Sequence, residues 1–186
     1  MFVLVETTSL SMRDKTSPPE PAVRKLTFKS STRKDAPNHH VVVPATGGAG
    51  DPTQHCGILV VYISAGSGEK TTVALPASGW RLLGKSTAPK GFRFAGSDPN
   101  GPVSRVIVKA DQVKVRAGRS SWAYTLNESS QGRIAVQLQL GTSPAWCADA
   151  PAKTGGNPPS TASNDLVDKF TAQPKTPPPA ACPPTP

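Results

Sequence analysis

Long apolar segments and targeting signals are missing from this sequence. No stretch of its 186 residues approaches the ~20 consecutive apolar residues of a transmembrane helix, so we expect no membrane span. The start is apolar only from Met1 to Val5 and lacks the basic region, longer apolar stretch and small-residue cleavage site of a signal peptide. The chain is therefore expected to be either a cytosolic protein or a mature piece of a longer exported one.

Residues that carry catalysis are also scarce. The chain has 12 acidic residues and three histidines, and it has no Gly-x-Ser-x-Gly elbow and no evident cysteine–histidine pairing. Neighbouring residues on a strand point to opposite faces, so neither His39-His40 nor His55-Cys56 readily supplies two metal ligands. We therefore expect no enzyme activity, no catalytic residue, no metal and no cofactor.

Proline and glycine, at 21 and 16 residues, are abundant, and proline costs ~3 kcal/mol inside a helix, which argues against a helical bundle. Short segments of strand character recur along the chain instead. Residues 58–63 are apolar on both faces, as a central strand would be, and lead into a predicted hairpin. The expected strands are residues 23–28, 58–63, 71–75, 92–94, 103–109, 112–116, 122–126 and 134–140. The sequence predicts an all-β fold, an antiparallel β-sandwich with jelly-roll-like topology.

Three segments are expected along the chain: an N-terminal arm (1–22), the β-sandwich domain (23–150) and a proline-rich tail (151–186). The tail has ten prolines in 36 residues and should be extended. Within it, residues 165–172 are expected to form a brief helix or a short strand. We expect the tail to dock on the domain or on a neighbouring molecule.

The net charge is +9, and residues 81–119 hold nine basic and two acidic residues. Arg105, Lys109, Lys114 and Arg116 fall at alternate positions of two expected strands, so one face of that hairpin should be cationic and suited to phosphate, carboxylate or sulfate groups. The alternative is a solvated face whose charges discourage edge-to-edge pairing. Aromatic residues are not interleaved with these cations, so we do not expect a nucleic-acid partner.

The large aromatic residues divide into two groups. Trp122 and Tyr124 share an apolar strand face with Leu126 and are expected in the core. Trp80 and Trp146 lie at strand ends and are expected to be exposed, where their rings would stack against sugars.

Three cysteines leave one over from any pair. A Cys147–Cys182 disulfide would tie the tail to the sandwich and needs an oxidising compartment. Cys56 would then be free or would bridge two chains. The alternative is three unpaired thiols in a cytosolic protein.

A set of short motifs spans nearly the whole chain, from residue 10 to residue 184. The motifs are SMRD at 11–14, VRKLTF at 23–28, GDPT at 50–53, ALPASGW at 74–80, YTLNE at 124–128, QGR at 131–133, LG at 140–141, WCA at 146–148 and PAACP at 179–183. Together they resemble a poorly characterised β-rich module, often repeated, of bacterial secreted and cell-surface proteins. The resemblance implies export, a single compact module and no known catalytic residues. Cys147 and Cys182 occupy its recurring cysteine positions, whereas Cys56 is a departure from the pattern.

These observations favour an extracellular, non-enzymatic structural or adhesive module that self-assembles at the cell surface. Its partners would be copies of itself or neighbouring modules. The alternative is a carbohydrate-binding module for acidic polysaccharides that uses Trp80 and Trp146 together with the basic residues.

Overall fold

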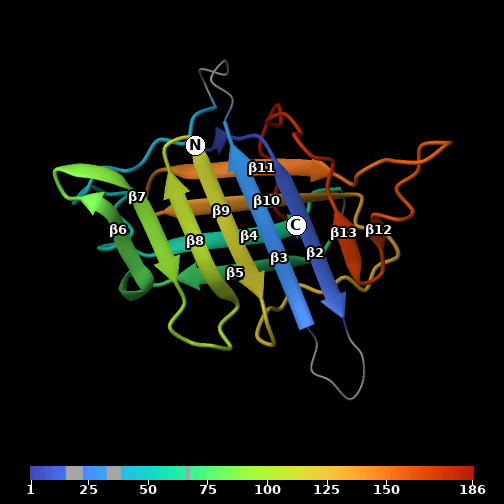
Figure 1. The fold of residues 1–186 in the computed structure, drawn as a ribbon, viewed down its shortest axis with the longest axis horizontal. Coiled ribbons are helices and arrows are strands. Elements are labelled where there is room, and N and C mark those ends of the chain that lie inside the picture. The colour runs from blue at the N-terminus through green and yellow to red at the C-terminus, as the bar shows by residue number, and fades with distance from the viewer. Residues whose placement is uncertain (16–22, 33–38, 66–67) are drawn as a thin grey trace.

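The computed structural model describes residues 1–15, 23–32, 39–65 and 68–186. These residues form an all-β fold of two sheets, and no α-helix occurs among them. The sheets lie one behind the other in Figure 1, and the strands of the front sheet cross those of the rear sheet steeply. The all-β, sandwich-like architecture predicted from the strand pattern is therefore confirmed.

The smaller sheet has five strands. In spatial order they are β1 (Val3–Leu4), β11 (Ala145–Pro151), β10 (Arg133–Leu140), β4 (Gly57–Ile63) and β5 (Lys70–Leu75). β1 pairs with β11 in parallel, and the other neighbours are antiparallel.

The larger sheet has eight strands, and all its neighbouring strands are antiparallel. In spatial order they are β12 (Asp165–Leu166), β13 (Lys169–Thr171), β2 (Ser9–Lys15), β3 (Val23–Ser31), β9 (Gln112–Gly118), β8 (Val103–Lys109), β7 (Ala88–Ala95) and β6 (Trp80–Lys85). A single 3₁₀ turn (Ala77–Gly79) connects β5 to β6 within the described chain. Because β6 to β9 form a meander within one sheet, the strand order does not confirm the predicted jelly-roll connections.

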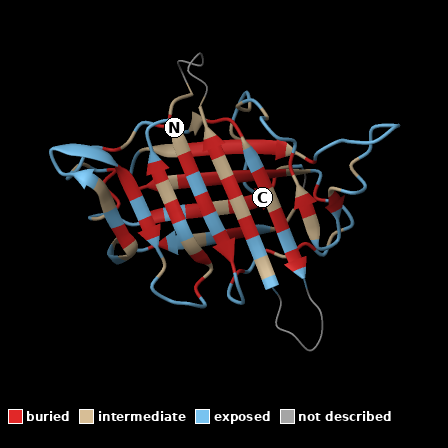
Figure 2. Cartoon of the chain, in the orientation of Figure 1, coloured by how far each residue is buried: buried red, intermediate tan, exposed pale blue. Residues whose placement is uncertain are grey.

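One hydrophobic core fills the space between the sheets. It takes inward residues from both, such as Leu26 and Val115 from the larger sheet and Leu59 and Val136 from the smaller one. Figure 2 shows the result as buried and exposed residues alternating along the strands of the larger sheet. This alternation is the two-residue period of a sheet with one face on the core and the other toward solvent.

The predicted strand over residues 122–126 is wrong, although its expected core side chains are correct. This segment joins no sheet, yet Trp122, Tyr124 and Leu126 are all at most 2% exposed. The extended chain turns alternate side chains into the core without strand neighbours on either side.

The predicted arm and tail both contribute strands to the fold. Residues 3–4 and 9–15, expected in the arm, form β1 and β2, while residues 16–22 lie outside the described chain. In the tail, residues 165–172 form β12 and β13 instead of a helix, and Phe170 is fully buried. The arm therefore adds β1 to the smaller sheet and β2 to the larger one, and the tail adds β12 and β13 to the larger sheet.

The predicted exposure of Trp80 and Trp146 is wrong, because they are 1% and 2% exposed. Each stands at an inward position, Trp80 opposite Phe94 and Trp146 opposite Leu138. The Trp80 ring packs on Phe94 with centroids 5.4 Å apart, and its Nε1 donates to the Leu75 carbonyl at 3.2 Å. Neither ring is available to stack on a sugar.

Candidate functional site

The outward face of the larger sheet is covered with basic side chains, and we call it the cationic face. Strand alternation produces it: hydrophobic side chains such as Leu26, Phe28 and Val115 point inward, and their neighbours point outward. The cationic face consists of Arg13, Lys15, Lys25, Lys29, Arg81, Arg93, Arg105, Lys109, Lys114, Arg116 and Lys169.

Like charges stand directly opposite one another across this face. Arg105 faces Arg116, and Lys29 faces Lys114. The other like-charged pairs are Lys169–Arg13, Arg13–Lys25 and Arg81–Arg93. Directly opposed like charges destabilise a sheet. The arrangement therefore costs stability in the isolated molecule and favours a bound anion that offsets the repulsion.

The predicted hairpin cations Arg105, Lys109, Lys114 and Arg116 all lie on this face. They lie inside the sheet, because β8 pairs with both β7 and β9, and β9 pairs with both β8 and β3. Protection of a sheet edge, the alternative explanation, does not apply to interior strands.

Carboxylates are absent from the outward strand positions of the cationic face, as far as the described residues show. Asp14 on β2 points inward, where its carboxylate accepts from Arg24 Nε at 3.2 Å. Asp111, in the turn between β8 and β9, contacts His40 Nδ1 at 2.6 Å. The cations of the face therefore have no neutralising acidic neighbours on these strands.

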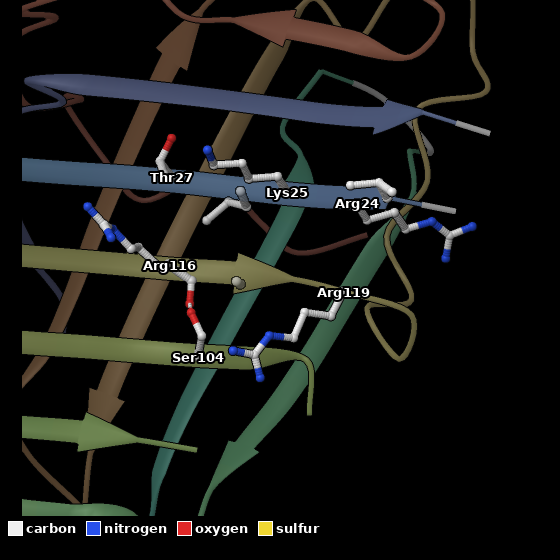
Figure 3. A pocket seen from close by; sticks show the side chains of 9 residues that line it. Arg24, Lys25, Thr27, Ser104, Arg116 and Arg119 are labelled. Carbon is white, nitrogen blue, oxygen red and sulfur yellow. Dashed lines mark hydrogen bonds between the residues drawn. The ribbon is translucent and has the colours of Figure 1, made fainter. Parts of the chain in front are cut away.

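Two adjoining hollows lie at one end of the cationic face and share Lys25 and Thr27. The first has a volume of about 310 Å³ and lies between β3, β8 and β9 (Figure 3). We call it the Gly118 hollow after Gly118, which pairs with Lys25 beside it. Its lining residues include Lys25, Thr27, Ser104, Arg116 and Arg119.

The second hollow has a volume of about 510 Å³ and lies over β2 and β3. It is lined by Ser11, Arg13, Lys15, Lys25 and Thr27 among others.

Seven cations of the face were missed at the sequence level. The sequence contains a signal for two of them, because Lys25 and Lys29 alternate with Leu26 and Phe28 as on a half-buried strand. They join the cations of β8 and β9 in one face only through the strand order, which places β3 beside β9 and β2 beside β3. The missed residues are Arg13, Lys15, Lys25, Lys29, Arg81, Arg93 and Lys169.

The Cys147–Cys182 disulfide is present and closes a loop with a sequence separation of 35. It fixes residues 177–186, the C-terminal strap, over the smaller sheet. Tyr62 Oη donates to the Pro183 carbonyl at 2.6 Å and accepts from Gln137 Nε2 at 2.8 Å. Burial raises the pKa of Tyr62 above its ordinary value, and the bond from Gln137 opposes that rise only in part.

Cys56 is free and exposed in the turn before β4. Two of the three histidines have separate side-chain partners, His39 Nδ1 the Leu4 carbonyl at 2.8 Å and His40 Nδ1 the Asp111 carboxylate. The described part of the chain contains no group of three or more metal-ligating side chains. Nor does it contain a helix with the length and apolar character needed to cross a membrane.

Comparisons with known proteins give no match, whether to family models, to curated proteins or to solved structures. The resemblance to a repeated bacterial surface module therefore stays a prediction. The candidate site depends on the geometry of the cationic face alone.

Proposed function

We propose that this chain is an exported, non-enzymatic adhesive module that binds an extended acidic polysaccharide through the cationic face. The observation that carries the proposal is the set of like-charged pairs opposed across neighbouring strands of the larger sheet. Such pairs oppose folding in the free protein, so their presence is accounted for by an anionic partner. The disulfide supports export, because disulfides persist in oxidising compartments.

An acidic polysaccharide fits the face better than a nucleic acid does. Proteins that hold single-stranded nucleic acid stack its bases on exposed aromatic rings. Here all three tryptophans and both tyrosines are buried, so the face has charge without stacking platforms. A polymer with regularly spaced acidic groups and no bases needs only the charge and the hydroxyls that the face provides.

The test compares two triple variants that remove equal charge. R105Q/K114Q/R116Q removes central cations of the face, and K70Q/K153Q/K175Q removes three exposed lysines elsewhere. We expect the first to weaken binding to dextran sulfate and polygalacturonate by about tenfold, as loss of three surface charge contacts allows. The control triple should change affinity by less than about twofold.

Titration calorimetry at low and moderate salt, with neutral dextran as the blank ligand, measures these affinities. Equal weakening by both triples would mean that only net charge matters and would contradict the proposal. Tighter binding to double-stranded DNA than to either polysaccharide would point to a nucleic-acid function instead.

A further inference from the structure

The Gly118 hollow lies beside a glycine that no other residue replaces without strain. Gly118 has φ +131°, a conformation that favours glycine, and a Cβ there would lie 2.1 Å from the Arg24 carbonyl oxygen. The chain therefore approaches the backbone of β3 closely at this point, directly opposite Lys25. The hollow lies beside this close approach and is lined by Lys25, Arg116 and Arg119 among others.

Arg119, the next residue, is held at the rim of the hollow. Its φ of 73° is in the left-handed region, and its amide donates to the Arg24 carbonyl at 2.9 Å. Its Nη1 donates to the Asp98 and Pro99 carbonyls at 3.3 and 2.5 Å. These bonds use the two hydrogens of Nη1, so the three N–H groups on Nε and Nη2 stay available to a ligand. Figure 3 shows the Arg119 side chain extending toward Ser104, whereas Arg24 points away.

Hydroxyl groups complete the surroundings. Thr27 Oγ1 and Ser11 Oγ share one hydrogen bond of 2.7 Å, which uses one of their two protons and leaves the other free to donate. Ser104, where the β8–β9 register shifts, donates its hydroxyl to the Arg116 carbonyl at 3.1 Å and so braces the backbone beside the hollow. The donor-bearing residues that line the hollow thus come from β3 (Lys25 and Thr27), from β9 (Arg116) and from beyond the end of β9 (Arg119).

We propose that the Gly118 hollow binds one tetrahedral oxyanion, a sulfate or phosphate ester group, in preference to a carboxylate. Donors on several sides suit the three terminal oxygens of such a group, whereas a carboxylate presents two oxygens in one plane. The volume of about 310 Å³, against ~30 Å³ for one water molecule, has room for the group and part of the sugar that carries it. The inference rests on the proposed function, in which the polysaccharide supplies the group.

The first experiment uses inorganic sulfate and inorganic phosphate, titrated at constant ionic strength and followed by amide chemical shifts. We expect saturable shifts at residues 25–27, 104 and 118–119. K25Q, inside the hollow, should raise the dissociation constant about threefold, the size of one exposed charge contact, and T27V should also raise it. K109Q removes one charge from the same face outside the hollow and should leave the constant for the small ion nearly unchanged.

The second experiment compares dextran sulfate, dextran phosphate and carboxymethyl dextran of equal length and charge. The two tetrahedral esters should bind more tightly than the carboxylate polymer, and the tighter of the two identifies the source of the group. K25Q should remove this preference, whereas K109Q should weaken binding to all three alike.

The two proposals fail in different ways. Shifts that do not saturate, or that K25Q and K109Q weaken equally, overturn the oxyanion site even if dextran sulfate still binds to the cationic face. A saturable sulfate site combined with polymer binding that ignores the face cations overturns the polysaccharide function and leaves the oxyanion site standing.

Discussion

Buried carboxylates in this protein act as acceptors that hold loops in place. Asp51, with 0% exposure, accepts from the amides of Gly47 and Thr53 at 2.7 and 2.9 Å and from Thr53 Oγ1 at 2.7 Å. Asp165 does the same for the amides of Gln131 and Gly132, at 2.7 and 2.8 Å. Burial of Asp51 favours its neutral form, but these hydrogen bonds outweigh that effect and hold its pKa below the ordinary value.

Replacing Asp51 with asparagine should lower the free energy of unfolding at pH 7 by about 1–3 kcal/mol, because a neutral amide has one acceptor oxygen in place of two charged ones, so at least one of the three donors loses its acceptor. A depressed folded-state pKa contributes stability above the unfolded pKa of about 3.9, and this contribution is lost as pH falls through the lower folded value. The difference between wild type and D51N in urea unfolding should therefore shrink below about pH 4. A difference that stays constant from pH 7 to pH 2.5 would contradict this role.

At the scale of elements, the C-terminal strap shows how a proline-rich segment is kept on a sheet without forming a strand. Prolines lack the amide hydrogen needed for a ladder, so the strap is attached by the disulfide and by single bonds such as Tyr62 Oη to Pro183. Because the strap lies over the smaller sheet, β10 is covered on both faces, and Ala135 and Gln137 are buried on its outward side.

Removing the disulfide as C147A/C182A should cost about 3–4 kcal/mol of unfolding free energy, the chain-entropy value for a loop of this length. The freed strap should also expose Tyr62, so its pKa should fall toward the ordinary value, measured by tyrosinate absorbance during pH titration. Tyr124 is a built-in reference, because burial raises its pKa far more and it does not depend on the strap. An unchanged Tyr62 titration in the variant would show that the strap stays docked without the bond.

Alternation predicted most of the interior strands, since residues 103–109 and 112–116 match β8 and the main part of β9. It did not predict β2 as part of the sheet, although Leu10 and Met12 alternate there with Arg13 and Lys15. That strand is secured by β3 and by β13, whose residues lie more than 150 positions further along the chain. Within the cationic face, the alternation of residues along the sequence identified four cations. The other seven join them through the pairing of strands that are distant in the sequence.

At the scale of the whole molecule, the charge is strongly one-sided. Within the described ranges, eleven of the 19 basic residues lie on the cationic face, which leaves eight basic against ten acidic residues and a formal charge of −2 for the rest of the described chain. The net charge of +9 therefore comes from one face. The alternation of basic and apolar residues along the sequence pointed to part of this asymmetry, whereas the total charge alone did not locate it.

The exposed, unpaired Cys56 predicts the oxidative behaviour of the whole molecule. Without reductant we expect a fraction of wild type at twice the 19.4 kDa chain mass by light scattering, and with reductant the single-chain mass. C56S should give the single-chain mass in both conditions, since Cys147 and Cys182 are bonded to each other. A larger species in C56S would indicate self-assembly through other surfaces.

Concentrating the positive charge on one side gives the molecule an electric dipole roughly perpendicular to its sheets. Near a negatively charged layer such a dipole rotates the protein before contact, so encounters are already correctly oriented. Adsorbed copies would then share one polarity, with the larger sheet against the layer and the strapped smaller sheet outward. The orientation of such a layer would follow from the charge pattern of a single chain.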